Sequence, residues 1–332
     1  MERVSLKMIA NELGVSIATV SLVLNGKNKN GRVSQGMSQK IIDKAAELNY
    51  VPNNFAKSLK MGRSKTIGLI VADISNVFFG SLALHIQICA EKAGYTVFIG
   101  NTNEKLIEME KMIKLFKARQ VDGLIITPTE GSEKLIKDLL KADIPFVLVD
   151  RSFPELDVDS VLINNYQISN VSTKHLLKKG CRNIAFVTYK QDQFHINERK
   201  RGYMEAMKEV GLFNPENVKE VRYGFLEKDI RKAISQIMKS EKKIDGIFFA
   251  TNSISLAGVK SLFNYKIELQ KDIQIMCFDE SEAFYLLPFS VPFVKQPIEE
   301  MGKQAVRSLL SQVERHANEE RHVILNAALI NK

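Results

Sequence analysis

The sequence lacks the residues and motifs on which most enzymes and metal proteins depend. Its three cysteines, Cys89, Cys181 and Cys277, are widely spaced without a CxxC pair, so we expect buried packing residues in a reducing compartment. Its five histidines form no HExxH or comparable ligand spacing, so we predict no metal site. It contains neither a glycine-rich phosphate loop nor a GxSxG elbow, so we predict no cofactor and no catalytic residues.

Long apolar segments are also absent. The chain contains no run of about eighteen apolar residues, so we expect no transmembrane helix. Its first residues, MERVSLKMIANELG, lack the apolar core of a secretory signal, and we therefore expect a cytoplasmic protein. This argues against a transport-type binding protein.

Positive charge is concentrated near the N-terminus. The first 65 residues hold eleven Lys and Arg against four Asp and Glu, a net charge of +7, whereas the other 267 residues carry +2. A basic segment before a nearly neutral body favours a polyanionic partner for that segment. The alternative is a basic surface that only keeps the protein in solution.

Three short helices are expected in residues 1–50. Ser5, Ser16 and Ser34 can cap them, and Gly14 can end the first one. Two helices joined by a turn with glycine, followed by a supporting helix, are typical of a helix-turn-helix. The positions expected to face inward are Leu6, Ile9, Ala10, Leu13, Val20, Val23, Leu24, Ile41, Ile42, Ala45 and Leu48.

From Thr66 onward, apolar runs alternate with amphipathic stretches of helical length. The runs are TIGLIVAD, TVFIG, GLIITP, PFVLVD, NIAFVTY, GIFFA and IQIMCFD. This alternation predicts an α/β fold with parallel sheets covered on both faces, arranged as two units. Ligands of such sheets bind beyond the carboxyl ends of the strands, so we expect a binding cleft between the units.

The motifs of the chain resemble, in their order and spacing, those of the lactose/galactose repressor family of bacterial transcription regulators. They are GVSIATVSLVLNG, GRVS, LNYVPNNFAKSLKMGRSKTIGLIV, DISNVFFG, VDGLIITP, IPFVLVDR, ERKRGY, CFDE and VKQPIEEMG, and they span nearly the whole sequence. The resemblance implies a sequence-specific DNA-binding regulator, a repressor of carbohydrate-related genes, that is allosteric and is not an enzyme.

The same resemblance implies a domain plan. It gives an all-α helix-turn-helix head (1–50), a hinge helix with linker (51–65) and a two-lobed body like the periplasmic binding proteins (66–332). We expect lobe one at about 66–164 and 294–320, and lobe two at about 165–293 and 321–332. The chain stops before any heptad tail of the kind that makes some members tetramers, so the resemblance implies a homodimer on a palindromic operator.

The second expected helix carries apolar residues on its outward face. The resemblance places Ile17, Ala18 and Leu22 where the family reads base edges in the major groove, and apolar side chains there would pack on thymine methyl groups. The alternative is that they pack against another part of the protein. Relatives commonly have Arg at position 22, so the usual operator of the family cannot be assumed. Small polar residues suited to phosphate oxygens are Ser16, Thr19, Ser21 and Asn25.

The segment VPNNFAKSL resembles the hinge of the family. Pro52 fixes its entry, and Asn53 can cap a helix over residues 54–60 that is too short to be stable alone. The resemblance implies that it folds beside its twin in the minor groove, where Leu59 wedges into a base step. The alternative is an ordinary linker. The expected DNA-contacting residues of this segment are Asn53, Ala56, Lys57, Leu59 and Lys60.

Polar and aromatic residues just past the predicted strand ends correspond to the cleft of the family. They are Asn76, Phe78, Phe79, Asp150, Arg199, Phe225, Asn252, Asp279 and Gln296. An arginine with carboxylates can bond vicinal hydroxyls while rings cover an apolar face, which suits a small sugar. Ser253 replaces the aspartate that is usual in the family and leaves one acceptor fewer.

Other interpretations of these residues remain open. Phe78 and Phe79 could be plain core, Asp279 could cap a helix, and Arg199 could form an exposed pair with Glu198. The family also includes members controlled by a serine-phosphorylated carrier protein, so a phosphorylated protein partner is the alternative to a sugar effector.

Overall fold

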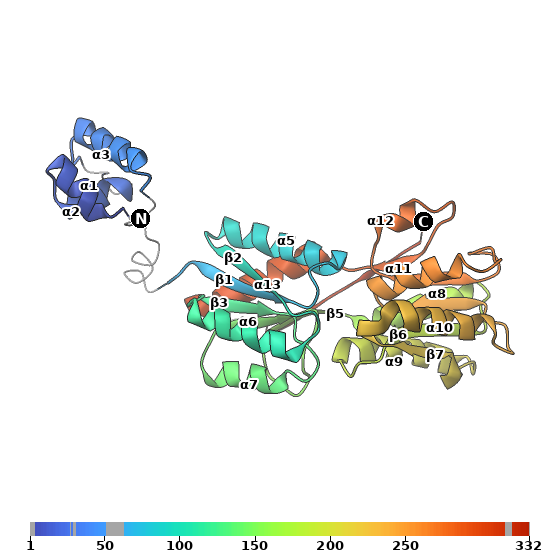
Figure 1. Cartoon of the computed structure of the whole chain (residues 1–332). Helices are drawn as coiled ribbons and strands as arrows, with labels where there is room; N and C mark the ends of the chain where they lie inside the picture. The colour runs from blue at the N-terminus through green and yellow to red at the C-terminus, as the bar shows by residue number, and fades with distance from the viewer. Residues whose placement is uncertain (1–3, 27, 29–30, 51–62, 316–320, 332) are drawn as a thin grey trace. The chain divides into compact units, whose positions relative to one another are not determined.

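The structure, a computed structural model, describes residues 4–26, 28, 31–50, 63–315 and 321–331. Its contacts divide the chain into two units, Met1–Ser64 and Lys65–Lys332. Figure 1 shows a small helical unit, the head, and a larger unit of sheets and helices, the body.

The head consists of α1 (Leu6–Leu13), α2 (Ile17–Leu24) and α3 (Gln35–Glu47). Each helix follows the predicted serine, whose hydroxyl accepts a hydrogen bond from the backbone N–H three residues further on. Gly14 ends α1 in the left-handed conformation, with φ 63°, which glycine adopts without strain. The predicted caps of the helix-turn-helix are therefore confirmed.

A small apolar core holds the three helices together. Its buried residues are Ile9, Ala10, Val20, Val23, Ile41 and Ala45, with Leu6, Leu13, Leu24 and Leu48 partly buried around them. The prediction for Ile42 is wrong, because its side chain is 47% exposed. Successive helical residues are turned by about 100° from one another, so the position after Ile41 faces solvent.

The body contains two six-stranded sheets, each of which forms the centre of one lobe. The first has the order β11-β5-β4-β3-β1-β2 and consists of β1 (Thr66–Val71), β2 (Thr96–Asn101), β3 (Gly123–Ile126), β4 (Phe146–Val149), β5 (Ser160–Ile163) and β11 (His322–Leu325). The second has the order β12-β10-β9-β8-β6-β7 and consists of β6 (Ile184–Tyr189), β7 (Val218–Val221), β8 (Gly246–Phe249), β9 (Gln274–Phe278), β10 (Phe293–Lys295) and β12 (Ala328–Ile330). Only the pairing of β10 with β12 is antiparallel among the described strands. The predicted α/β fold with parallel sheets is confirmed.

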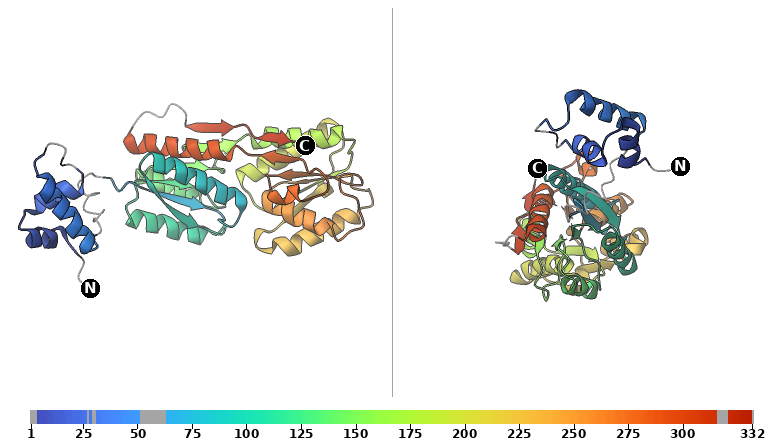
Figure 2. Two further views of the ribbon diagram at one scale, coloured as in Figure 1. Left: turned by 90° about the horizontal axis from the view of Figure 1, so that it is seen from above. Right: turned by 90° about the vertical axis from the view of Figure 1, so that its left-hand side faces the viewer.

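Helices cover both faces of each sheet, as Figures 1 and 2 show. In lobe one, α5 (Val77–Lys92) and α13 (Ile298–Glu314) cover one face, and α6 (Leu106–Ala118) and α7 (Glu133–Lys141) cover the other. In lobe two, α8 (Asn165–Lys178) and α9 (Phe194–Glu209) lie opposite α10 (Leu226–Met238) and α11 (Asn252–Leu262). Shorter elements are α12 (Glu282–Tyr285), η1 (Pro215–Asn217) and η2 (Tyr223–Phe225).

The chain passes between the lobes at three places, and two of the predicted lobe boundaries need correction. β11 pairs in parallel with β5, so it belongs to lobe one and not to lobe two. β10 pairs with β9, so lobe two extends through Lys295. Asn164 ties two crossings together, because its Oδ1 accepts from the N–H of Ala327 at 2.9 Å and its amide donates to Asn326 at 3.1 Å.

Three further findings concern the cysteines, metal-binding groups and membrane-spanning helices. Cys181 and Cys277 are buried, but Cys89 is only partly buried. No group of three or more His, Cys, Asp or Glu is placed to hold a metal in the described part of the chain. Within the same residues, no single helix is long and apolar enough to cross a membrane, and α1 and α2 reach that length only together, with a bend of 112° between them.

Helices α8 and α9 pack closely because Gly202 has no side chain. A Cβ at this position would lie 2.3 Å from the carbonyl oxygen of Tyr166 and 2.9 Å from the backbone nitrogen of Asn170. Both are backbone atoms, which cannot move without shifting α8. The glycine of the ERKRGY motif therefore sets the distance between α8 and the helix that carries Arg199.

We expect Gly202→Ala to destabilise the body by about 1–3 kcal/mol, because overpacking outweighs the gain in helix propensity. Gly80→Ala is the matched control, since a Cβ in α5 would meet only the carbonyl oxygen of Ile74 at an ordinary 3.6 Å. Urea unfolding followed by circular dichroism checks both variants. Equal midpoints for Gly202→Ala and wild type would contradict the packing argument.

Candidate functional site

The outward face of α2 is apolar, as the sequence predicts. Ile17 is 48% exposed, Ala18 is exposed and Leu22 is partly exposed. None of the three belongs to the apolar core of the described head, which takes Val20 and Val23 from this helix. The described residues of the head therefore leave this face open to a partner.

The small polar residues of the head lie beside this face and bond to one another. The hydroxyls of Ser16 and Thr19 are 2.8 Å apart. The amide of Asn25 donates to the backbone oxygen of Ser21 at 2.7 Å and to its hydroxyl at 3.2 Å. The remaining predicted DNA contacts, Asn53, Ala56, Lys57, Leu59 and Lys60, lie outside the described residues.

In the body, a pocket lies beyond the carboxyl ends of strands from both sheets. Eight of the nine residues predicted for the cleft line it: Asn76, Phe78, Phe79, Asp150, Arg199, Asn252, Asp279 and Gln296. Phe225 does not line it, because its ring is 55% exposed and lies 4.3 Å from the guanidinium of Arg222. Tyr223, at the start of the same 3₁₀ turn, lines the pocket instead.

The sequence analysis missed several lining residues. They are Asp73, Glu104, Arg151, Tyr189, Gln191, His195, Tyr223 and Thr251, whereas Ser253 lines the pocket at the position where the sequence analysis noted a change from the family pattern. Many of them also follow strand ends, so the same signal could have found Asp73 after β1 and Arg151 after β4. Glu104 lies beyond the edge strand β2 and carries no signal of its own.

Arg199 is the buried cation of lobe two. Its Nε donates to Asn165 at 2.7 Å, its Nη1 donates to the carbonyl of Ala250 at 2.9 Å, and its guanidinium lies 3.6 Å from the centre of the Phe278 ring. Burial lowers the pKa of Arg199, which the aspartates nearby partly offset. The alternative of an exposed pair with Glu198 is wrong, because Arg199 is 2% exposed and Glu198 pairs with another arginine of α9.

Asp150 and Asp279 occupy equivalent places in the two lobes. Each directly follows a central strand, is nearly buried and has a left-handed backbone, with φ 68° and 70°. Non-glycine residues with such values are uncommon and cluster at functional sites. Burial raises the pKa of both carboxyls, that of Asp279 to about 6. Asp279 accepts from Gln296 at 2.6 Å, whereas Ser281 caps α12, so Asp279 is not that helix's cap.

Glu104 and Arg151 form a buried, two-pronged ion pair, with N–O distances of 2.6 and 2.7 Å. Burial lowers the pKa of Arg151, but Glu104 outweighs this effect and the pKa is raised. Burial, together with Arg151 and Arg199, holds the pKa of His195 well below its usual value, so the ring is neutral. Its Nδ1 and the Oε1 of Gln296 are buried without a hydrogen-bond partner among the described residues.

Hydrogen bonds join the lobes across the cleft. The hydroxyl of Tyr223 donates to Asp73 at 2.7 Å, and the amide of Asn76 donates to Ser253 at 3.3 Å. The cavity between these contacts measures about 40 Å³, enough for one or two waters. A larger molecule can enter only if the lobes separate or these contacts rearrange.

The edge of lobe one formed by α5 and β2 carries exposed apolar residues. α5 and β2 are in contact. The helix exposes Val77, Leu84 and Ile88, and the strand exposes Phe98 on one face of the sheet and Ile99 on the other. The sequence predicts sheets that are covered on both faces. This expectation is wrong for the edge strand β2, which is partly uncovered. Clustered apolar side chains of this kind are typical of protein–protein contacts.

Comparisons with known proteins agree with this arrangement. Residues 5–53 match the model of the bacterial regulatory proteins of the lacI family, and residues 64–332 match the model of periplasmic binding proteins and sugar binding domain of the LacI family. A ribose operon repressor of Halalkalibacterium halodurans is 31% identical over 94% of this chain and 91% of its own. The transcriptional repressor PurR of Aliivibrio fischeri (strain MJ11) is 28% identical over 99% of both chains.

A solved structure supports the fold. The lac repressor dimer, bound to operator and the anti-inducer ONPF, superposes with a TM-score of 0.86 at 19% identity, covering 99% of this chain and 98% of the other. Because the family models together match nearly the whole sequence, the chain belongs to the LacI family of bacterial DNA-binding transcriptional regulators, which are not enzymes.

Proposed function

We propose that the protein represses genes of carbohydrate use and that a small, neutral sugar bound between the lobes controls its affinity for DNA. The observation that carries this proposal is the pocket, because eight residues chosen from the sequence converge on it from both lobes. Such a regulator acts on the bacterial chromosome, and so in the cytoplasm. The ribose operon repressor among its relatives supports a carbohydrate effector.

The charges of the pocket favour a neutral ligand. Four carboxylates line it, those of Asp73, Glu104, Asp150 and Asp279, against the guanidinium groups of Arg151 and Arg199. A phosphorylated or carboxylated ligand would add negative charge to a site that already holds an excess of it. Sugar hydroxyls can instead donate to the carboxylates and accept from Arg199, while Phe78 or Tyr223 covers a ring face.

Control by a phosphorylated protein remains the alternative. That mechanism requires no ligand in the cleft. The buried Nδ1 of His195 and Oε1 of Gln296, which have no hydrogen-bond partner among the residues that the structure describes, instead offer hydrogen bonds to a small molecule. The cleft therefore favours the sugar.

The exposed apolar residues of α5 and β2 support a homodimer. A dimer carries two heads, which suits a palindromic operator, since half-sites mirror the two-fold symmetry of the protein. We expect DNA binding to weaken steeply with salt, because each head neutralises several phosphates.

The most direct test is in vitro selection of DNA by the purified protein, with and without a panel of neutral sugars. We expect a palindromic motif whose enrichment changes with at least one sugar, because the ligand shifts DNA affinity by its different affinity for two lobe arrangements. A palindrome insensitive to every neutral sugar, with a response to a phosphoprotein instead, would contradict the sugar-controlled mechanism.

The outward, partly exposed side chain of Leu22 gives a prediction about operator sequence. Leu22→Arg should shift the selected motif toward a guanine at one position of each half-site, because Arg can donate two bonds to O6 and N7. The expected discrimination is about 1–3 kcal/mol. Ile42→Arg is the control, because Ile42 is an exposed apolar residue of the head that lies on α3. An unchanged motif for Leu22→Arg would show that the residue does not face the groove.

The raised pKa of Asp279 gives a prediction about stability. The folded protein binds this proton more tightly than the unfolded chain does, so the stabilisation is complete below pH 4 and is lost as the pH rises through about 6. Asp279→Asn keeps the left-handed backbone and the bond from Gln296 but removes the buried charge. At pH 7.5 we expect the variant to unfold at a higher temperature than wild type, with a free energy of unfolding larger by up to roughly 3 kcal/mol. Near pH 4 we expect the two proteins to unfold at similar temperatures.

The same variant should bind the sugar more weakly, because the carboxylate is the stronger acceptor. Asp229→Asn is a control of opposite sign, since the ion pair with Arg222 holds the pKa of this partly buried carboxyl below its usual value. Thermal unfolding at several pH values checks both. A difference between Asp279→Asn and wild type that does not change with pH would contradict the assignment of a buried charge.

A further inference from the structure

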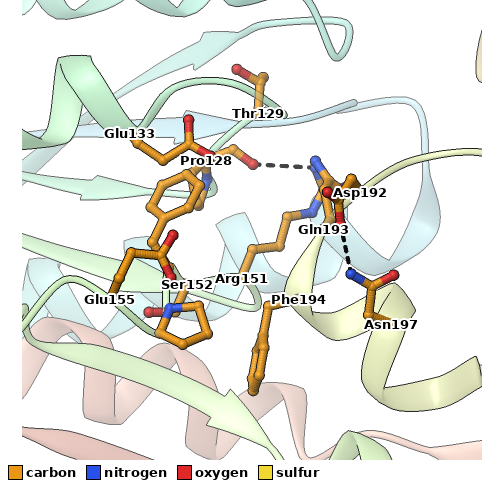
Figure 3. A pocket seen from close by; sticks show the side chains of 12 residues that line it. Pro128, Thr129, Glu133, Arg151, Ser152, Glu155, Asp192, Gln193, Phe194 and Asn197 are labelled. Atoms are coloured by element: carbon orange, nitrogen blue, oxygen red, sulfur yellow. Dashed lines mark hydrogen bonds between the residues drawn. The ribbon is translucent and has the colours of Figure 1, made fainter. Parts of the chain in front are cut away.

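A second and larger cavity lies in the same cleft. It measures about 260 Å³ and is lined by the loops after β3 and β4 of lobe one and by the start of α9 in lobe two. Figure 3 shows Thr129, Glu133 and Glu155 on one side and Asp192, Phe194 and Asn197 on the other.

The two cavities share a wall. Arg151 lines both of them, and Figure 3 shows its guanidinium bonded to the carbonyl of Pro128 at the edge of the larger one. At the start of α9, Phe194 lines the larger cavity and the next residue, His195, lines the smaller one. The two cavities are therefore adjacent, with the side chain of Arg151 between them.

The walls of the larger cavity combine rings with carboxylates. Phe153 and Phe194, both partly exposed, supply aromatic faces, and Pro128 and Pro154 add apolar surface. The carboxylates are those of Glu133, Glu155 and Asp192, and Asn197 donates to Asp192 at 2.8 Å. Arg151 is the basic group among the described lining residues, and its charge is matched by Glu104.

This chemistry selects a neutral, hydroxylated ring. The C–H face of a sugar packs on aromatic rings, and its hydroxyls donate to carboxylates. A phosphate or uronate would face three carboxylates without a free cation from this wall. An apolar ligand would leave those carboxylates desolvated, at a cost in free energy.

We propose that the larger cavity is a second sugar subsite, so that the effector is a neutral glycoside of at least two rings, with one ring in each cavity. This inference rests on the proposed function. The size of the larger cavity supports it, since about 260 Å³ is available there before any movement of the lobes, whereas the smaller cavity, at about 40 Å³, must open to admit its ring. Phe194 acts as the stacking residue of the second ring.

Calorimetry on the full-length protein tests this proposal with a panel of neutral disaccharides and the monosaccharides that compose them. We expect at least one disaccharide to bind about tenfold more tightly than either component, the increment that one aromatic contact supplies. Phe194→Ala should remove this increment and leave the affinity for the monosaccharide unchanged. Phe225→Ala is the matched control, because Phe225 is exposed and lines neither cavity.

Asn197→Trp provides a second variant, because Asn197 is exposed and a larger side chain there fills the cavity without disturbing the core. It should block the disaccharide and spare the monosaccharide. If disaccharides bind no better than their components, or if both variants bind them like wild type, the second subsite is wrong while the proposed function stands. If no neutral sugar binds at all, the proposed function fails and this inference fails with it.

Discussion

Burial of charge between the lobes is the constraint on which the pocket depends. Arg199, Asp150 and Asp279 are almost excluded from water, and a buried charge without compensation costs several kcal/mol. The guanidinium of Arg199 donates to the side-chain oxygen of Asn165 and the carbonyl of Ala250. The pKa values of Asp150 and Asp279 are raised, which indicates that nearby groups do not fully compensate the burial of these two carboxylates. A ligand that donates hydroxyls to these carboxylates would supply what is missing. Ligand binding and closure of the lobes are then linked by one free-energy term.

The connections between the lobes determine how that free energy can act. The three crossings of the chain lie at Ile163–Asn165, Lys295–Ile298 and Leu325–Ala328, and the side chain of Asn164 joins the first to the third. Because these connections are short and bonded to one another, the lobes can rotate about them but cannot slide far apart. The bond from Tyr223 to Asp73 lies across the cleft and is broken when the lobes open. A ligand that stabilises closure therefore acts on the same rotation.

Strands were predictable from the sequence where they are buried on both faces. The continuous apolar runs indicate β1, β3, β4, β6, β8 and β9, and also β2 at an edge. The strands that were missed, such as β7 with the sequence VKEV and β11 with HVIL, are short or partly exposed. Their strand conformation depends on pairing with β6 and β5, which are distant in sequence. The pattern of apolar residues within a short segment does not indicate such long-range pairing.

The same distinction holds for the pocket. Residues directly after buried strands, such as Asp150 and Asp279, were predictable because topology alone brings strand ends together. The prediction that Phe225 lines the pocket was wrong. A 3₁₀ turn places Tyr223 at the pocket instead of Phe225, and the apolar pattern of the sequence does not indicate that turn. Glu104 was missed because its place depends on an ion pair with Arg151, 47 residues away.

In the head, apolar side chains are exposed to water, at a cost in solvation free energy, whereas in the body charged side chains are buried. A core of three short helices can bury only Val20 and Val23 fully from α2, so Ile17 and Leu22 stay accessible. Polar residues at these positions would give a better surface for a free head, and a local rule broken in this way is expected at a recognition site. Contact of Ile17 and Leu22 with thymine methyl groups would bury apolar area, a contribution to affinity that salt does not screen. Phosphate contacts supply the salt-dependent part of binding. Sequence preference at the half-site should therefore persist at salt concentrations that remove most non-specific binding.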